Sequence, residues 1–169
     1  MNDEDRISKE RTVKKRVYLE TTIVSYLAAR PSRDLIIAAH QELTREWWNE
    51  RRDRFGLYIS QFVLDEAGGG DVEAAQRRVA LLAGVPKVPI TDEAISLAGA
   101  VIHQDVIPPN AAGDALHVAV ATVHQIDILL TWNCRHLANA EILGPLASCL
   151  RSLGFDPPII CTPAGLMGA

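Results

Sequence analysis

The chain of 169 residues contains few cysteines, few aromatic residues and no long apolar run. Its three cysteines are Cys134, Cys149 and Cys161, and no two of them form a C-x-x-C pair, so neither a disulfide framework nor a cysteine zinc site is indicated. No apolar stretch approaches the roughly 18 residues that cross a bilayer, and the first residues lack the apolar segment of a signal peptide. We therefore expect a cytoplasmic protein without a membrane partner.

Excess charge of one sign is also absent. The formal net charge is −4, from 17 lysines and arginines against 21 acidic residues. Proteins that coat nucleic acid through bulk electrostatics need many cations facing phosphate, so the sequence excludes that class while leaving room for a metal-assisted phosphate site. With 48% hydrophobic residues the composition is typical of a globular protein, and the length predicts one compact domain.

The chain does contain short apolar segments that alternate with helical patterns. These segments predict five strands, at residues 17–19, 57–59, 88–90, 128–130 and 158–161. The alternation predicts an α/β fold, a three-layer α/β/α sandwich around a central, mostly parallel sheet of about five strands. Residues 1–16 mix both charges with few apolar side chains and predict a flexible N-terminal arm, and residues 17–169 form the single domain.

The helical segments between these strands begin at recognisable capping residues and carry apolar stripes. The predicted caps are Ser32, Ser60, Asp71 and Thr91. The apolar positions that we expect to face the core in the second and fourth helical segments are Leu35, Ile36, Ala39, Leu43 and Trp47, and Ala75, Val79 and Leu82.

Four polar residues are predicted near the carboxyl ends of the strands. Glu20 ends the first strand, Glu66 follows the second, Asn133 follows the fourth, and Asp114 lies near the start of a helix. Ligands of open parallel sheets bind at this edge, where loops and helix N-termini converge. Carboxylates gathered there repel one another unless a cation neutralises them, and oxygen ligands select Mg²⁺ or Mn²⁺. Each acid taken singly is more often a helix cap or a solvated residue, but together they predict a divalent metal site.

The same residues lie in segments that resemble the motifs of PIN-domain ribonucleases. Residues 17–27 are similar to the opening motif, in which a strand ends in an acid followed by Thr-Asn or Thr-Thr. Asp65-Glu66, residues 113–119 and residues 130–133 resemble the next three motifs in the correct order. The resemblance spans residues 17 to about 161, and the size matches VapC-type toxins. Glu20 and Asn133 replace the usual aspartates, as in a subgroup of VapC-like proteins with Glu-Thr-Thr and Thr-Trp-Asn.

The resemblance implies a ribonuclease that uses Mg²⁺ or Mn²⁺ to hydrolyse RNA phosphodiester bonds, leaving 5′-phosphate and 3′-hydroxyl ends. It implies that Glu20, Glu66 and Asp114 are catalytic and bind metal, with Asn133 as a further ligand. Such toxins belong to type II toxin–antitoxin pairs, so the expected partners are the RNA substrate, a cognate antitoxin and a second copy in a homodimer.

Further polar residues are expected to contact the substrate. Thr21, His117, Arg135 and His136 are these candidates. His117 shares a helix face with Asp114 and is equally well explained as a histidine packed beside the core. Arg135 and His136 are equally well explained as exposed members of a capped turn.

Two other functions are compatible with the sequence. Glu20 and Asn133 are also consistent with a catalytically weakened PIN module that binds RNA or a protein without cutting. A small-molecule phosphohydrolase on another acidic α/β scaffold is the more distant alternative, and the motifs at the strand ends favour RNA.

Overall fold

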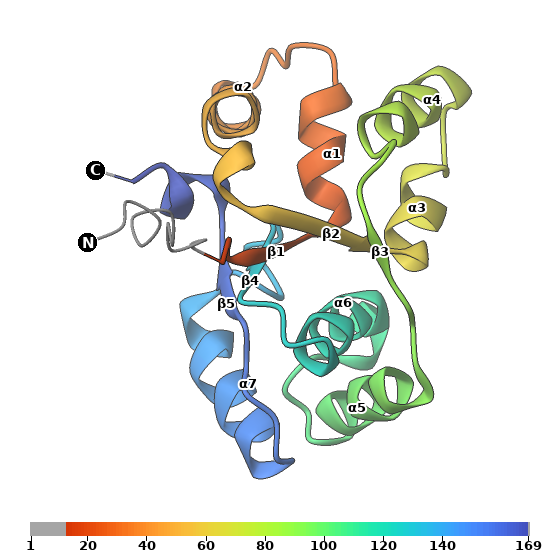
Figure 1. Cartoon of the computed structure of the whole chain (residues 1–169), viewed down its shortest axis with the longest axis vertical. Helices are drawn as coiled ribbons and strands as arrows, with labels where there is room; N and C mark the ends of the chain where they lie inside the picture. The colour runs from red at the N-terminus through yellow and green to blue at the C-terminus, as the bar shows by residue number, and fades with distance from the viewer. Residues whose placement is uncertain (1–12, 169) are drawn as a thin grey trace, which may run out of the picture.

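The computed structural model describes residues 13–168, whose five strands form one parallel sheet in the order β3-β2-β1-β4-β5 (Figure 1). The strands are β1 (Arg16–Leu19), β2 (Gly56–Ser60), β3 (Lys87–Val88), β4 (Ile128–Leu130) and β5 (Ile159–Cys161). Every neighbouring pair is parallel. The predicted parallel sheet is therefore confirmed, and the fifth strand lies at an edge as expected.

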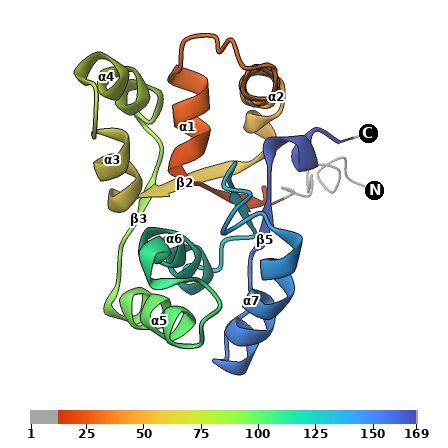
Figure 2. The same ribbon diagram turned by 180° about the vertical axis from the view of Figure 1, so that it is seen from behind.

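Helices cover both faces of this sheet, as two opposite views show (Figures 1 and 2). One layer consists of α1 (Thr21–Ala28), α2 (Leu35–Glu50), α3 (Gln61–Ala67) and α4 (Val72–Leu81). The other consists of α5 (Asp92–His103), α6 (Ala112–Val123) and α7 (Ala140–Ser152). Short 3-10 helices occupy Arg52–Arg54, Pro109–Ala111 and Pro163–Leu166. The predicted three-layer α/β/α sandwich is confirmed.

The core lies on both faces of the central strands, and this determines where β1 ends. Val17, Tyr18 and Leu19 are fully buried, as are Leu129 and Leu130 of β4. Such continuous apolar runs are typical of parallel strands covered by helices on both sides. Because β1 lies between β2 and β4, the residue that follows it is at the middle of the sheet's carboxyl edge.

Two of the predicted helix caps are correct and one is displaced. The carboxylate of Asp71 accepts the amide of Ala74 at 2.9 Å, and the hydroxyl of Thr91 accepts that of Ala94 at 3.2 Å. Ser32 does not cap α2. The cap is Asp34, because its carboxylate accepts two amides of the first turn while the Ser32 hydroxyl accepts the amide of Asp34 at 3.1 Å.

The fourth predicted cap, Ser60, precedes α3 but forms no capping hydrogen bond. Its hydroxyl is fully buried and lies 2.7 Å from the Tyr18 hydroxyl of the neighbouring strand. The Ser60 hydroxyl therefore bonds Tyr18, 42 positions away in the sequence, instead of an amide at the start of α3.

Part of the predicted inward apolar set faces solvent instead. Leu35 is 86% exposed, Ile36 is 70% exposed and Val79 is 41% exposed. The buried residues of α2 are Gln41, Thr44, Trp47 and Trp48. They all lie in the later turns of this helix, so its first turn extends beyond the packed layer and leaves its apolar side chains uncovered.

Two strand boundaries differ from the prediction, and the predicted N-terminal arm stays untested over most of its length. Residues 1–12, which hold most of the predicted N-terminal arm, lie outside the described residues. β1 begins at Arg16, whose amide donates to the Asp127 carboxylate at 2.7 Å. The third strand ends at Val88 rather than at residue 90. Among residues 13–168, no helix combines the length and the apolar character needed to span a membrane.

Candidate active site

Glu20 lies at the end of β1 and caps α1 while keeping one carboxylate oxygen free. It is only 4% exposed. Its Oε2 accepts hydrogen bonds from the amide of Thr22 at 3.1 Å, from the Thr22 hydroxyl and from the Thr131 hydroxyl at 2.7 Å. Within residues 13–168, no hydrogen bond reaches Oε1. The capping and the functional interpretations of Glu20 therefore apply to different oxygens of the same carboxylate.

The two threonines that contact Glu20 also tie the loop after β4 to the start of α1. The Thr22 hydroxyl accepts the amide of Trp132 at 2.8 Å, and the Thr131 hydroxyl accepts the amide of Asn133 at 2.9 Å. These contacts hold the carboxyl ends of two neighbouring strands in one arrangement. Sequence reasoning did not single out Thr131, although its position at the end of a strand is the same signal that identified Glu20.

Glu66 reaches the same edge from α3 and contacts His117 of α6. Glu66 Oε2 lies 2.9 Å from His117 Nε2 and also accepts a hydrogen bond from the Thr21 hydroxyl. The same ring nitrogen is 4.0 Å from Glu20 Oε1. A carboxylate oxygen of Glu20, one of Glu66 and a ring nitrogen of His117 thus lie within 4.8 Å of one another. The neighbouring Asp65 is exposed and pairs with Gln61, so Glu66 is the acid that faces the group.

The surroundings of Glu66 favour its ionised form. Burial by itself raises the pKa of this carboxyl. Hydrogen bonds from His117 and Thr21 are the main interactions that oppose this effect, and the pKa of Glu66 is lowered below its ordinary value.

A buried tyrosine and serine lie behind His117. The Tyr18 hydroxyl is 3.0 Å from His117 Nδ1 and 2.7 Å from the Ser60 hydroxyl. Burial raises the pKa of Tyr18 above its ordinary value, so the phenol keeps its proton. Sequence reasoning treated Tyr18 only as a core residue. Strand alternation was the available signal, because positions 18 and 20 of one strand point to the same face.

Asp114 lies in the first turn of α6 and is not part of the close group. It is partly buried and forms no hydrogen bond within residues 13–168. Its neighbour Gly113 lies close to the group. A Cβ atom at this glycine would lie 3.2 Å from Cζ of Phe62 and 3.8 Å from Oε1 of Glu66. The start of α6 therefore borders the group, with the Asp114 carboxylate free of internal partners.

The side chain of Asn133 stabilises the turn after β4. Its side-chain oxygen accepts the amides of Arg135 at 3.2 Å and of His136 at 3.0 Å. This Asx arrangement orders the turn and takes up the oxygen that was predicted to bind metal. Arg135 is exposed and His136 is partly buried.

Trp132 anchors the same turn to α2. Its indole Nε1–H donates to the Thr44 hydroxyl at 2.7 Å. The ring of His40 stacks on it, with centroids 4.0 Å apart and planes inclined by 16°. One indole face is therefore already covered by a neighbour in α2.

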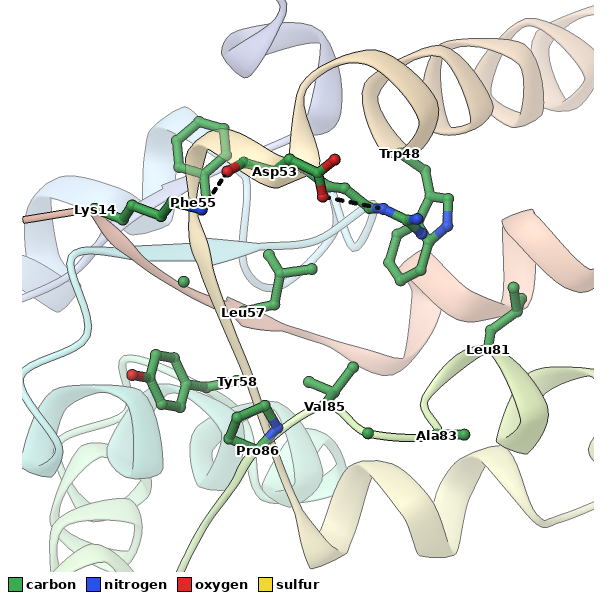
Figure 3. Close-up of a pocket in the computed structure, with 13 residues that line it drawn as sticks. Lys14, Trp48, Asp53, Phe55, Leu57, Tyr58, Leu81, Ala83, Val85 and Pro86 are labelled. Atoms are coloured by element: carbon green, nitrogen blue, oxygen red, sulfur yellow. Dashed lines mark hydrogen bonds and ion pairs between the residues drawn. The ribbon is translucent and has the colours of Figure 1, made fainter.

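A separate cavity of about 460 Å³ lies at the amino end of β2 (Figure 3). Trp48, Tyr58 and Arg52 contribute to its lining, and the Arg52 guanidinium lies 4.7 Å from the Trp48 ring centroid. None of the predicted site residues lines this cavity. The candidate active site is therefore the group at the carboxyl edge.

The carboxylates of that group suit a divalent cation in their chemistry. Two glutamates supply hard oxygen atoms of the kind that Mg²⁺ and Mn²⁺ prefer. Glu20 is almost fully buried, and within residues 13–168 its Oε1 accepts no hydrogen bond. An almost fully buried carboxylate is stabilised by nearby positive charge, and a cation that reaches Oε1 would provide it.

No protein-family model and no curated protein match the sequence, but solved structures match the fold. One is VapBC2 from Rickettsia felis, bound to a DNA fragment from its promoter, with 14% identity, a TM-score of 0.55 and coverage of 87% of this chain and 98% of the other. Another is VapC20 of Mycobacterium tuberculosis, a toxin that cleaves the sarcin-ricin loop, with 16% identity, a TM-score of 0.53 and coverage of 71% and 92%.

These likenesses define the class of fold. The chain is an α/β/α protein with an acidic group at the carboxyl edge of a parallel sheet. More particularly, it has a VapC-like PIN-domain fold, as its sequence motifs predict.

Proposed function

We propose that this chain is a metal-dependent ribonuclease that hydrolyses RNA phosphodiester bonds and is the toxin of a type II toxin–antitoxin pair. The convergence of Glu20, Glu66 and His117 within 4.8 Å carries the proposal. The VapC-like fold supports it, and one protein of that fold, VapC20, is described as a toxin that cleaves the sarcin-ricin loop.

In this proposal three carboxylates form the ligand set of the cation. Glu20 Oε1 and Glu66 hold the cation, and Asp114 completes the ligand set from the first turn of α6. Bound Mg²⁺ or Mn²⁺ would lower the pKa of a water molecule and stabilise negative charge on the phosphate. Asn133 takes part through its free amide group, because its oxygen already accepts two amides of its turn.

The RNA backbone must approach a site that carries several negative charges. Arg135 is exposed on the turn after Asn133 and forms no ion pair within residues 13–168. Its guanidinium is free to bind a phosphate and to offset repulsion by the carboxylates. His136 follows it in the same turn and is a second candidate for substrate contact. Thr21 acts through Glu66, to which its hydroxyl already donates.

A catalytically weakened PIN module that binds RNA or a protein is the second candidate. Two observations favour it: the oxygen of Asn133 is engaged in its turn, and Asp114 does not join the group of close ligand atoms. This candidate keeps the fold and RNA contact but loses cleavage.

The test compares cleavage of labelled RNAs by purified, antitoxin-free protein in Mn²⁺, Mg²⁺ or EDTA. We expect cleavage that requires metal and that Glu66→Gln lowers by about 100-fold or more, because an electrostatic group at the reacting phosphate is lost. Asp65→Asn is the matched control, since its carboxylate is exposed and pairs with Gln61. It should leave the rate unchanged.

Glu20→Gln and Asp114→Asn extend the same test. Loss of cleavage in both, with unfolding midpoints close to that of the wild type, supports the full ligand set. Equal cleavage by Asp114→Asn contradicts the role of that residue. Absence of cleavage in every metal, by folded protein that still binds RNA, favours the weakened module.

The proposed partners are a cognate antitoxin and a second copy of the chain. Exposed apolar side chains on the layer of α2 and α4 offer contact surface to a partner. They are Leu35, Ile36, Val72 and Val79. Co-purification with the protein encoded beside it, and the mass of the free chain in solution, test these two partners separately.

A further inference from the structure

A continuous line of hydrogen bonds runs from the interior of the sheet to the candidate active site. It connects Ser60, Tyr18, His117 and Glu66, with distances of 2.7, 3.0 and 2.9 Å between successive polar atoms. Ser60 and Tyr18 are fully buried and His117 is 1% exposed, whereas Glu66 is partly exposed. Only the last member of the line therefore reaches the substrate side.

The chemistry of the last member determines how protons are arranged along this line. An ionised carboxylate only accepts hydrogen bonds, so His117 Nε2 must carry the proton that it shares with Glu66. In a neutral imidazole Nδ1 is then an acceptor, and the Tyr18 hydroxyl is the donor within 3.0 Å. The Tyr18 oxygen in turn accepts the proton of Ser60. Each group donates toward the active site, and no member lacks a partner.

We propose that Tyr18 is a positioning residue of the active site: its hydroxyl fixes the His117 ring in the Nε2–H tautomer, and this ring holds Glu66 toward Glu20. The inference rests on the proposed function and adds two buried residues, Tyr18 and Ser60, to the parts that shape its site. Neither of them touches the metal or the substrate.

Glu66 needs such support because of where it lies. It belongs to a helix of seven residues, and its side chain is 37% exposed, so several rotamers compete with the one that faces Glu20. A donor on a fully packed ring keeps the carboxylate in one position before a ligand arrives. Groups that orient a ligand from behind typically change metal affinity or activity by roughly 10–100-fold when they are removed.

Two features of the fold supply this rigidity. Tyr18 lies on β1 two positions before Glu20, which follows the strand in an extended conformation, so both side chains point to the same face. The Phe62 ring of α3 packs against the His117 ring, with centroids 4.9 Å apart. The imidazole is therefore held at Nδ1 by Tyr18 and packs against the tilted ring of Phe62.

The first experiment reads the tautomer directly, by long-range ¹H–¹⁵N correlation spectra of His117 in the metal-free protein. We expect the Nε2–H form in the wild type, unchanged by Mg²⁺, and a mixture of tautomers in Tyr18→Phe. A wild-type ring with its proton on Nδ1, or protonated at both nitrogens, overturns the proposal. A switch of tautomer on addition of Mg²⁺ also overturns it, because His117 would then be a direct ligand.

The second experiment measures Mn²⁺ affinity by titration calorimetry and RNA cleavage for Tyr18→Phe and Ser60→Ala. We expect Tyr18→Phe to weaken Mn²⁺ binding by about tenfold and to lower kcat with little change in KM, since substrate contacts remain. Ser60→Ala leaves the tyrosine donor in place, so its effect should be smaller.

Tyr58→Phe is the matched control, because Tyr58 is the register partner of Tyr18 on β2 and lines the remote cavity (Figure 3). It should change neither the tautomer nor the affinity. If Tyr18→Phe keeps both the Mn²⁺ affinity and kcat, the positioning role of Tyr18 is wrong, and the proposed ribonuclease function is unaffected. If no RNA is cut, the tautomer and the Mn²⁺ affinity still decide the inference.

Discussion

At the scale of single residues, the site depends on how each carboxylate divides its oxygens. Glu20 uses Oε2 to bond the start of α1 and the loop after β4, while Oε1 lies 4.0 Å from His117 Nε2 and accepts no hydrogen bond within residues 13–168. Glu66 has a fixed donor in His117 and a second in Thr21. Each carboxylate is thus held by hydrogen bonds to one of its oxygens. This is the arrangement expected of a preorganised ligand set.

The lowered pKa of Glu66 predicts how the metal-free protein responds to acid. A carboxyl with a lower pKa in the folded chain stabilises the fold fully above its unfolded pKa, near 4.5, and loses that contribution as the pH falls through its folded pKa. The difference in free energy of unfolding between wild type and Glu66→Gln should therefore be constant above about pH 6 and shrink below the ordinary carboxyl range. Urea unfolding at a series of pH values measures it, and a constant difference down to acid pH contradicts it.

At the scale of elements, α6 is decisive because its first turns meet α3 at the site. His117 faces Glu66, and Gly113 leaves room for the Phe62 ring. A helix that begins with a small residue comes close enough to α3 for an imidazole to reach a carboxylate.

This close approach predicts different outcomes for two helical glycines. Gly99 in α5 is exposed and has nothing within 4 Å of an added Cβ. Gly99→Ala should raise the free energy of unfolding by about 0.5–1 kcal/mol, because alanine loses less entropy in a helix. Gly113→Ala should gain less and weaken Mn²⁺ binding, because its Cβ would lie 3.2 Å from Phe62, which must then move beside Glu66.

Urea unfolding and calorimetry of the two alanine variants check both statements. If both variants are stabilised equally and Gly113→Ala keeps its Mn²⁺ affinity, the contact between α3 and α6 accommodates a methyl group and the prediction is wrong.

At the scale of the whole molecule, the sheet order brings distant segments to one edge. β1 lies between β2 and β4, so the ends of these three strands deliver Glu20, Ser60 and Thr131 to adjacent places. Helices on both faces bury the sheet and keep this edge in one arrangement.

The two-sided burial predicts a steep difference between central and edge strands. Leu129 of β4 is fully buried, and Leu129→Ala should lower the free energy of unfolding by about 2–5 kcal/mol through lost burial and a residual cavity. Ile159 of the edge strand β5 is 59% exposed, and Ile159→Ala should stay within about 1 kcal/mol. Chemical denaturation of both variants measures the contrast, and similar losses would argue against the layer arrangement.

Local patterns in the sequence were sufficient for the class of fold and for the two glutamates of the site. Apolar runs of strand length, separated by helical periods, predict a parallel α/β sheet wherever they occur. An acid directly after such a run is at the carboxyl edge, so Glu20 was predictable, and Glu66 was predicted from its place in the helix after the second strand together with the PIN-like motif. The caps Asp71 and Thr91 were predictable too, because a cap bonds within its own turn.

Only the tertiary structure decided which contacts those residues make. Tyr18 meets His117 across 99 positions, and Glu20 meets Thr131 across 111 positions. Long-range packing also pairs the Ser60 hydroxyl with Tyr18 instead of the start of α3, and it leaves Leu35 without a covering element. Hydrophobic periodicity and helix capping involve residues a few positions apart, so the local sequence specifies them. The partner of a buried polar atom depends on which segments pack together, and that is determined by the free energy of the whole fold.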